Sequence, residues 1–391
     1  MFSTAALNEN PDGAAALAGI GLPEDGTAPA PDLALFFASP LYEDLPAIVA
    51  QAYQRSAASI MVGCSGQGVV GIEKEVEGRP GLSLLSLALP GTEFFPKRVE
   101  TKDIANLESP ESWRQWLGAP QERINAWIVL ADPFTFDSER FINGLAAAYP
   151  DRPIVGGLAS GSPNERHTSV FLNGQVHESG AVVVGIGGAF TVRSVVAQGA
   201  MPIGHPWTIT SVEREVITSI GNRPATTVLQ ETIDGLAEDV RERATRNLLV
   251  GLALDEYKDE LHQGDFLIRN LMGIDPRSGA IAINAIPSVG QTMQFQIRDA
   301  EAADEDLRRQ LAEVREELAG VETTGALLCT CNGRGTGLFG TADHDAHAVA
   351  EALGQLPLSG FFCNGEIGPV GGRPFLHGFT ASLALFIPKT H

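Results

Sequence analysis

The sequence predicts a mixed α/β (α+β) fold of two related domains, in which helices flank mixed β-sheets built from repeated β-α-β-β units. Apolar strand-like segments alternate with amphipathic helices over most of the 391 residues. A loop of the form Gly-x-x-x-x-Gly follows a strand in three places, and Asn173-Gly174 marks a tight antiparallel hairpin. Strands joined partly by helices and partly by hairpins indicate sheets with both parallel and antiparallel pairs.

The chain is predicted to begin with a flexible arm over residues 1–31, which is rich in Ala, Gly and Pro and has no Lys or Arg. Its Gly21–Pro31 segment is typical of a linker. Ordered structure is expected from Asp32 onward. We expect an N-terminal domain over residues 32–225 and a C-terminal domain over residues 226–391.

The first repeated unit begins with a buried strand at Leu33–Ala38, followed by a helix at Glu43–Ser56 with apolar residues at helical spacing. The glycine loop Gly63–Gly68 comes next. A long apolar strand at Leu82–Leu89 completes the unit.

The second and third units repeat this order of strand, helix, glycine loop and closing strand, with loops at Gly156–Gly161 and Gly360–Gly365. The second unit comprises Trp127–Ala131, Ser138–Ala148, Pro153–Gly161, the hairpin strand Val170–Leu172 and Ala181–Ile186. The third comprises Gly325–Cys331, Asp345–Leu353, Leu358–Phe362 and Phe379–Ile387. A weaker fourth copy is predicted over Leu248–Leu254, a helix around Tyr257, Phe266–Met272 and Ala280–Ile286.

Two amphipathic helices are predicted between the units, at Thr226–Arg243 and Ala300–Ala319. Acidic residues crowd the first turn of the second helix, as the helix dipole favours.

Composition excludes several classes of function. A net charge of −21 argues against binding to nucleic acid or to anionic membranes, which attract basic surfaces. No apolar run approaches the roughly 20 residues of a membrane span, and the N-terminus lacks the basic region of a signal peptide. Four cysteines in so long a chain do not form a disulfide framework. We expect a cytoplasmic protein without a cofactor.

The candidate site lies on the glycine-dense turn within Leu358–Thr380, which carries Cys363, Glu366, Arg373 and His377. A thiol, a carboxylate and an imidazole are the components of a nucleophilic site. The alternative is that Cys363 is a small buried hydrophobic residue and His377 a structural hydrogen-bonding residue. Ligand binding is favoured over catalysis.

Other polar residues at strand ends extend the candidate site. Arg298 ends a strand and precedes a helix, where it forms either a local salt bridge with Asp299 or a fork for a ligand carboxylate. Asn332 and Arg334 follow the strand that ends at Cys331. Cys64 and Ser65 lie in the first glycine loop, which lacks the Lys-Ser/Thr of a phosphate-binding loop.

No metal site is predicted. The chain has no C-x-x-C pair, so a thiolate zinc site is improbable. The sequence His344-Asp345-Ala346-His347 is compatible with metal ligands, but His344 and Asp345 are predicted to cap or start a helix.

The long motifs of the chain resemble the FIST (F-box and intracellular signal transduction) family over about residues 32–387. The N-terminal part is similar in its Met61–Val70 run and Glu75-Val-Glu77. The C-terminal part is similar in Phe295–Asp299, Cys331–Gly335, Leu338–Gly340, His344-Asp345, Gly360–Gly372 and Leu376–Thr380. The resemblance implies a sensory module that binds small ligands, with amino acids or related metabolites as the proposed class. It implies no catalytic activity. Residues 1–31 are too few for an F-box or an output domain, so a stand-alone module is expected.

The leading hypothesis is a small-ligand-binding module of intracellular signal transduction, with its pocket at the domain junction. Arg298, Asn332 and Arg334 are predicted to contact an acidic group, and Glu366 an amine or cationic group. The remaining ligand-binding candidates are Cys363, Asn364, Arg373, His377, Cys64 and Ser65. The first rival is an acyl-transfer or hydrolytic enzyme using Cys363, His377 and Glu366. The second is an interaction scaffold, for which a signalling protein would be the partner.

Overall fold

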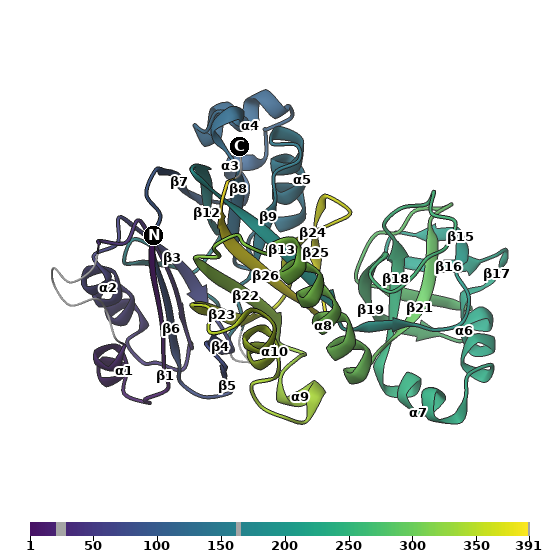
Figure 1. The fold of residues 1–391 in the computed structure, drawn as a ribbon. Helices are drawn as coiled ribbons and strands as arrows, with labels where there is room; N and C mark the ends of the chain where they lie inside the picture. Colours follow the sequence, from purple (N-terminus) through teal and green to yellow (C-terminus); the bar gives the residue numbers. More distant parts are fainter. Residues whose placement is uncertain (21–28, 162–165, 390–391) are drawn as a thin grey trace. The chain divides into compact units, whose positions relative to one another are not determined.

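The computed structural model describes residues 1–20, 29–161 and 166–389, and it confirms the mixed α+β class (Figure 1). The chain divides into two compact units. Unit 1 comprises Met1–Val196, Leu307–Leu376 and Thr380–His391, and unit 2 comprises Ala197–Asp306 and His377–Phe379. Among the helices of the described residues, none combines the length and apolar character needed to cross a membrane.

Three segments of unit 1 share one β-α-β-β topology. In the first, β2 (Leu33–Ala38) lies parallel to β3 (Ile60–Ser65) after the crossover helix α2 (Leu45–Ser56), and β6 (Leu82–Ala88) returns antiparallel to β2. Between β3 and β6 lies the hairpin β4 (Gly68–Gly71) and β5 (Lys74–Glu77).

The second and third segments have the same strand directions. The second contains β8 (Ala126–Ala131), α5 (Ser138–Ala148), β9 (Ile154–Leu158), β10 (Val170–Leu172), β11 (Gln175–His177) and β12 (Ala181–Gly188). The third contains β22 (Gly325–Cys331), α10 (His344–Leu353), β23 (Leu358–Cys363), β24 (Glu366–Val370), β25 (Arg373–His377) and β26 (Thr380–Pro388).

The three segments exchange their hairpins in a ring. The hairpin β4–β5 pairs with β23 of the third segment, β10–β11 pairs with β3 of the first, and β24 pairs with β9 of the second. A leading strand completes each sheet: β1 (Phe2–Asn8) beside β6, β7 (Thr92–Val99) beside β12 and β13 (Phe190–Gln198) beside β26. Over the described residues, this gives three six-stranded sheets with one common strand arrangement.

The first glycine of each loop occupies an equivalent position. Gly63, Gly156 and Gly360 lie opposite Phe36, Val129 and Leu328 on the neighbouring parallel strand. A Cβ atom at these glycines would lie 1.6, 2.0 and 1.9 Å from the carbonyl oxygen of that neighbour. Only glycine allows so close an approach of two backbones, so these glycines are explained by strand packing.

The three sheets of unit 1 share one apolar core. Phe37, Leu130 and Cys329 follow the three residues paired with the loop glycines, and all three are buried in the same cluster. The crossover helices cover the other faces, with Val49 of α2 and Phe141 of α5 buried in separate clusters. Further helices are α3 (Thr101–Ile104), α4 (Pro110–Leu117), η1 (Gln121–Arg123), α8 (Ala300–Glu317) and α9 (Thr336–Phe339).

The predicted flexible arm over residues 1–31 is corrected by the structure. Strand β1 pairs with β6 from Phe2 opposite Ala88 to Asn8 opposite Leu82. Helix α1 (Gly13–Gly19) follows, with Asp12 accepting a hydrogen bond from Ala15 N at its start. The small Ala and Ser side chains of this segment did not suggest a strand. The strand forms because its backbone pairs with the apolar strand β6. The central part of the predicted linker, residues 21–28, lies outside the described residues.

Unit 2 contains a barrel-like sheet. Strands β21, β15, β16, β20, β19 and β18 pair in that order, and β18 pairs back with β21 around a core that includes Ile217, Val250 and Phe295. Its elements are β14 (Ala200–Pro202), β15 (Trp207–Glu213), β16 (Val216–Ile220), β17 (Arg223–Pro224), α6 (Ala225–Asp234), α7 (Glu238–Asn247), β18 (Leu248–Ala253), β19 (Phe266–Asp275), β20 (Ala280–Ile283) and β21 (Thr292–Arg298).

Two expectations for unit 2 are wrong. The weak fourth copy is absent from this described region, because β18, β19 and β20 form an antiparallel meander and residues 255–264 contain no helix. The helix predicted over Thr226–Arg243 is two helices, α6 and α7, which are separated at Gly235. Glycine has a low helix propensity, so the helix is interrupted at Gly235 although the apolar residues on both sides keep helical spacing.

Candidate functional site

The three glycine loops of unit 1 meet at the carboxyl ends of the parallel strand pairs. Ser65 Oγ donates a hydrogen bond to the Ser160 carbonyl at 2.8 Å, and Ser160 Oγ donates to the Phe362 carbonyl. Asn364 N donates to the Leu158 carbonyl at 3.0 Å. The carboxyl ends of parallel strands are where α/β folds commonly place ligand sites. Ser65, one of the predicted ligand contacts, instead joins two loops.

Glu366 distinguishes the third loop from the other two. The register places Glu366 opposite Gly157, whereas the equivalent hairpin positions are Val69 opposite Phe361 and Val170 opposite Cys64. A fully buried carboxyl group therefore lies where the other two sheets have valine. Gly157 leaves room for it, since a Cβ there would lie 3.3 Å from the Cβ of Cys363.

Both oxygens of Glu366 are satisfied within the protein. Oε1 accepts a hydrogen bond from Cys363 Sγ at 3.1 Å, and Oε2 accepts from Thr380 N at 3.1 Å and Thr380 Oγ1 at 2.7 Å. Burial raises the pKa of Glu366 to about 7, although these hydrogen bonds favour the ionised form. The predicted contact between Glu366 and a ligand amine stays a prediction, and it concerns a carboxyl group that is fully buried.

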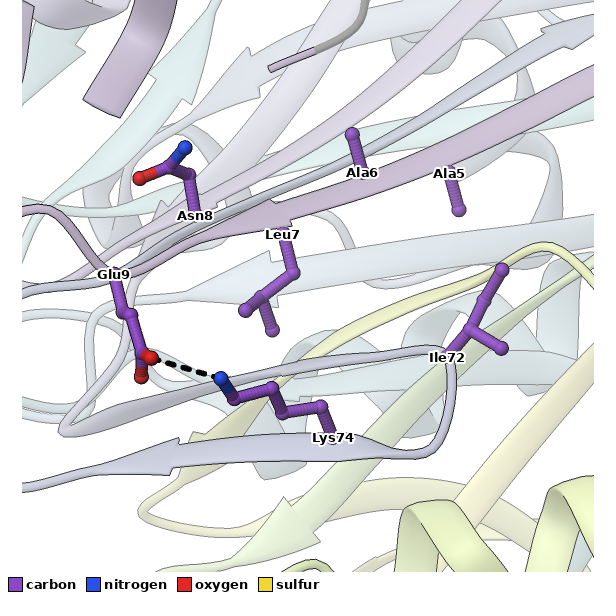
Figure 2. Close-up of a pocket in the computed structure, with 7 residues that line it drawn as sticks. All are labelled: Ala5, Ala6, Leu7, Asn8, Glu9, Ile72 and Lys74. Carbon is purple, nitrogen blue, oxygen red and sulfur yellow. Dashed lines mark hydrogen bonds and ion pairs between the residues drawn. The ribbon is translucent and has the colours of Figure 1, made fainter. Parts of the chain in front are cut away.

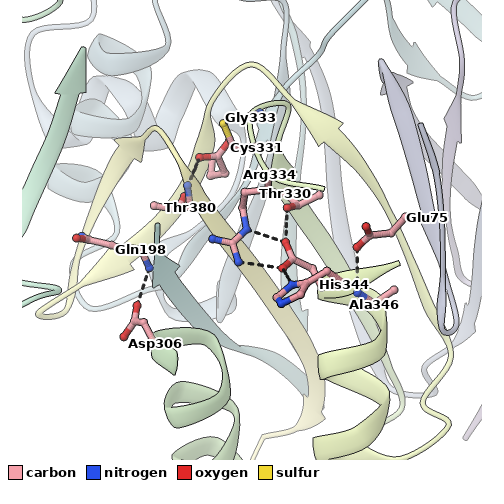
Figure 3. A network of polar contacts seen from close by, with 12 residues as sticks. Glu75, Gln198, Asp306, Thr330, Cys331, Gly333, Arg334, His344, Ala346 and Thr380 are labelled. Atoms are coloured by element: carbon pink, nitrogen blue, oxygen red, sulfur yellow. Dashed lines mark hydrogen bonds and ion pairs between the residues drawn. The ribbon is translucent and has the colours of Figure 1, made fainter. Parts of the chain in front are cut away.

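Arg334 and Asp345 form a buried ion pair. Figure 3 shows Arg334, Thr330 and His344 within this polar network. Arg334 Nε and Nη2 donate to the two carboxylate oxygens at 2.7 and 2.9 Å. Thr330 Oγ1 donates to Asp345 at 2.6 Å, and His344 Nδ1 lies 2.9 Å from it. Burial alone would raise the pKa of Asp345, but Arg334 and these hydrogen bonds hold it below its ordinary value. Helix α10 starts at His344, as expected, and Asp345 lies in its first turn, where its side chain orients Arg334.

The ion pair leaves one nitrogen of Arg334 for another partner. Arg334 is 1% exposed, and its Nη1 has no hydrogen-bond partner among the described residues. Asn332 Oδ1 is likewise a buried atom without a hydrogen-bond partner among the described residues. Buried polar atoms are nearly always satisfied in proteins, so each unsatisfied one requires an explanation.

The orientation of the Asn332 amide follows from its neighbours. Asn364 Nδ2 donates to the Ala159 carbonyl at 3.1 Å, so Asn364 Oδ1 is the end that accepts from Asn332 Nδ2 at 2.9 Å. The unsatisfied atom of Asn332 is therefore its acceptor oxygen. Asn364 is exposed and Asn332 half-buried, which makes this pair accessible from solvent.

Sequence reasoning missed Glu75 as part of this network. Its Oε1 accepts from Ala346 N at 3.0 Å, while Oε2 has no partner among the described residues. Burial first, and then the charge of Asp345, raises the pKa of Glu75 to about 8. The sequence pattern of the strand Lys74–Glu77 gave no signal for this burial, because alternation places Glu75 on the face opposite the core residue Val76.

Cys363 and Cys64 do not have the environment of a nucleophile that attacks a substrate arriving from solvent. Cys363 and Cys64 are fully buried, and burial raises the pKa of both thiols. Cys363 Sγ donates to Glu366 and to the Thr330 carbonyl at 3.2 Å. A catalytic cysteine needs a lowered pKa, and a carboxylate beside the thiol has the opposite effect.

Three further predicted residues lie away from this network or in unit 2. Arg373 is exposed at the start of β25. Arg298 ends β21 in unit 2, and its guanidinium carbon lies 5.9 Å from the ring centre of Phe379. His377 is buried and is assigned to unit 2. No group of three His, Cys, Asp or Glu side chains suited to a metal ion occurs among the described residues.

A pocket of about 370 Å³ lies elsewhere in unit 1, between β1 and the β4–β5 turn (Figure 2). It is lined by Ala5, Ala6, Leu7, Asn8, Glu9, Ile72 and Lys74. Lys74 Nζ and Glu9 Oε1 lie 2.8 Å apart and neutralise each other. None of the predicted site residues lines this pocket.

Two family models match adjoining parts of the chain: the FIST N domain over residues 32–223 and the FIST C domain over residues 225–369. The chain belongs to the FIST family. FIST domains are sensory domains of signal transduction. In this FIST protein the FIST C match spans most of unit 2 and much of the third segment of unit 1, including Asn332, Arg334 and Glu366.

Relatives of similar length occur in mycobacteria. An uncharacterised protein of Mycobacterium tuberculosis (strain CDC 1551 / Oshkosh) is 40% identical over 359 residues, covering 91% of each chain. Another, of Mycobacterium bovis, is 40% identical over 360 residues, covering 92% of this chain and 91% of its own. Among solved structures, a cyanuric acid hydrolase has a TM-score of 0.35 at 9% identity, with 100% of both chains covered. So low a score carries no conclusion about this chain.

Proposed function

We propose that this FIST protein is a sensory module that binds a small polar metabolite, such as an amino acid, at the glycine loops of unit 1. The supporting observation is the pair of unsatisfied buried atoms, Arg334 Nη1 and Asn332 Oδ1. The buried ion pair with Asp345 fixes the guanidinium, so the free nitrogen is held in position before a ligand arrives.

The chemistry of these two atoms defines the ligand class. Arg334 Nη1 is a charged donor and suits a carboxylate oxygen, while Asn332 Oδ1 is a neutral acceptor and suits an ammonium or amide N–H. A free amino acid carries both groups. In this proposal Asn332 makes the amine contact that was expected from Glu366, because Glu366 is fully buried and its oxygens accept hydrogen bonds within the protein.

Isothermal titration with the free amino acids and with small dicarboxylates tests this proposal. We expect one class to bind the wild type. We expect Asn332→Ala to weaken that binding by about tenfold, the value of one hydrogen bond of about 1.4 kcal/mol. Asn106→Ala is the matched control, since Asn106 is exposed in unit 1 after helix α3.

Arg334→Lys provides a second test, because lysine keeps the charge beside Asp345 but cannot present a free nitrogen in the same fork geometry. We expect it to lose binding to carboxylates more than Asn332→Ala does. Absence of binding by the wild type to every probe, or equal affinity in Asn332→Ala, Arg334→Lys and Asn106→Ala, would overturn the proposal.

A further inference from the structure

Two thiols of the candidate site occupy paired positions on neighbouring strands. Cys331 ends β22, Cys363 ends β23, and the parallel register places these two residues opposite each other. Paired residues of adjacent strands point to the same face, and the strands lie about 4.8 Å apart. A disulfide requires Cα atoms about 4.4–6.8 Å apart, so this pair meets the requirement. Both cysteines are reduced in the structure.

The two thiols differ in access to solvent. Cys331 is half-buried, and its Sγ accepts a hydrogen bond from Gly333 N at 3.4 Å. Cys363 is fully buried behind it, with its Sγ 3.1 Å from Glu366 Oε1. A small oxidant therefore reaches Cys331 first. Cys363 is the thiol that could react with an oxidised Cys331, and Glu366 is the base within reach of its proton.

We propose that Cys331 and Cys363 form a reversible disulfide when the protein meets a hydroperoxide, with Glu366 accepting the proton of Cys363. Cys331 Sγ attacks the peroxide, the O–O bond breaks, and an alcohol or water leaves with the Cys331 proton. The product is a sulfenic acid on Cys331. Cys363 Sγ then attacks Cys331 Sγ, the S–O bond breaks, and the departing hydroxide takes the proton from Glu366. Two thiols and one hydroperoxide give one disulfide, one alcohol or water, and one water.

The role of Glu366 agrees with its environment. Burial raises the pKa of Glu366 to about 7, so the carboxyl group can hold a proton near neutral pH and then release it. Val69 and Val170 occupy the equivalent hairpin positions of the first and second segments. The parallel strands of those two segments end in the pairs Ala38–Ser65 and Ala131–Leu158, without a thiol pair. The carboxyl group and the thiol pair thus occur together in the third segment.

The other cysteines are poorer partners for Cys331. Cys329 lies on the same strand two residues earlier, at a distance of about 6.6 Å along an extended backbone. That distance is at the edge of the range for a disulfide. The register pairs Cys329 with Phe361 and places Cys64 on β3 opposite Val170.

The disulfide would regulate the proposed ligand site, a consequence that rests on the proposed function. Asn332 and Asn364 directly follow the two cysteines and are joined by a 2.9 Å hydrogen bond. Drawing Cys363 Sγ toward Cys331 removes the donor from Glu366 Oε1 and moves the backbone that carries both asparagines. We expect the oxidised protein to bind the ligand found by titration more weakly than the reduced protein.

The test uses the full chain treated with equimolar hydrogen peroxide, without reductant. Intact-mass measurement should show the loss of two hydrogens, and tandem mass spectrometry of the digest should show Cys331 joined to Cys363. Dithiothreitol should restore the original mass. Cys331→Ser and Cys363→Ser should each abolish the cross-link, whereas Cys64→Ser should retain it.

Several results would overturn the proposal: no cross-link in the wild type, a cross-link through Cys329, or a sulfenic acid on Cys331 that persists beside an unreacted Cys363. Trapping with dimedone measures the first step separately from cross-linking. Glu366→Gln should accumulate the trapped sulfenic acid and slow cross-linking by about a hundredfold. An unchanged rate in Glu366→Gln would exclude Glu366 as the base. These measurements need no ligand. They therefore test the disulfide proposal even if the protein binds no small metabolite.

Discussion

Asp345 holds Arg334 by both carboxylate oxygens, in an ion pair whose side chains are each 1% exposed. The pair connects helix α10 to the loop after β22, and it positions Arg334 Nη1, which has no hydrogen-bond partner in the described part of the chain. Removing one member of such a pair leaves a buried charge without compensation, which is more costly than the pair itself is stabilising.

Asp345→Asn is expected to lower the free energy of unfolding by about 3–5 kcal/mol, because the Arg334 charge stays buried. Urea denaturation at pH 7 measures this change. Glu351→Gln is the matched control. Its ion pair with Arg308 has a similar N–O distance of 2.7 Å, but the two side chains are 63% and 50% exposed. The control should change stability by no more than about 1 kcal/mol. Equal effects of the two variants would contradict the importance of burial.

Stability should fall as pH rises from 5 to 8. The folded-state pKa of Glu366 is raised from 4.5 to about 7. Between these values the folded protein binds a proton that the unfolded chain has lost, so unfolding becomes easier as pH rises. Glu366→Gln should match the wild type at pH 5 and exceed it at pH 8 by on the order of 2–3 kcal/mol. Urea midpoints at both pH values provide the measurement.

Glu93→Gln is the control for this pH effect. Glu93 is exposed, and its hydrogen bond with Arg123 lowers its pKa from 4.5, so it does not titrate between pH 5 and 8. The stability of Glu93→Gln should therefore change with pH in the same way as the stability of the wild type. A wild-type protein that becomes more stable from pH 5 to 8, with Glu366→Gln following the same slope, would contradict the prediction.

Gly360→Ala should destabilise the protein by more than about 4 kcal/mol or prevent folding, since its Cβ would lie 1.9 Å from the Leu328 carbonyl oxygen. Thermal unfolding by circular dichroism tests this expectation. Gly337→Ala in helix α9 is the control, because a Cβ there meets nothing within 4 Å. That variant should be neutral or stabilised by up to about 1 kcal/mol. A small effect at Gly360 would mean that the parallel strands are not as close as described.

Iodoacetamide should label Cys363 more slowly than it labels a model thiol between pH 6 and 9. Burial raises the pKa of this thiol and blocks access to it, and the nearby carboxyl group of Glu366 raises the pKa further. Peptide mapping after timed alkylation of the reduced protein gives the rate at each cysteine, with urea-unfolded protein as the control. Faster labelling of native Cys363 than of the unfolded chain would support the rival hypothesis of a thiol-dependent enzyme.

Amide hydrogen exchange checks the order of the N-terminal strand. Alternate amides of residues 2–8 should be protected, because β1 is an edge strand that pairs with β6 along its whole length. The amides of β6 provide the internal reference for a protected strand. Exchange of residues 2–8 at random-coil rates would instead support the arm predicted from composition.

The sequence by itself determined the local elements and the chemical types at the site. Apolar periodicity located the strands β2, β8 and β22 and their crossover helices, since burial of one helix face needs only local spacing. The glycine loops at Gly63, Gly156 and Gly360 were recognisable because glycine allows what no other residue does. The long motifs identified the family. The same local reasoning failed for β1, where composition resembled a linker.

Only the tertiary structure decided which of these residues meet. Each hairpin pairs with a strand of another segment, and no local pattern specifies a partner so distant in sequence. That exchange places Glu366 opposite Gly157, in the position where valine occupies the other sheets. It also brings the loops of Ser65, Ser160 and Asn364 together. Asp345 was expected at a helix start and lies there, but its side chain binds Arg334 because folding buries both charges. Burial, which raises the pKa of Glu366 and of Glu75, is a property of the packed fold and not of the local sequence.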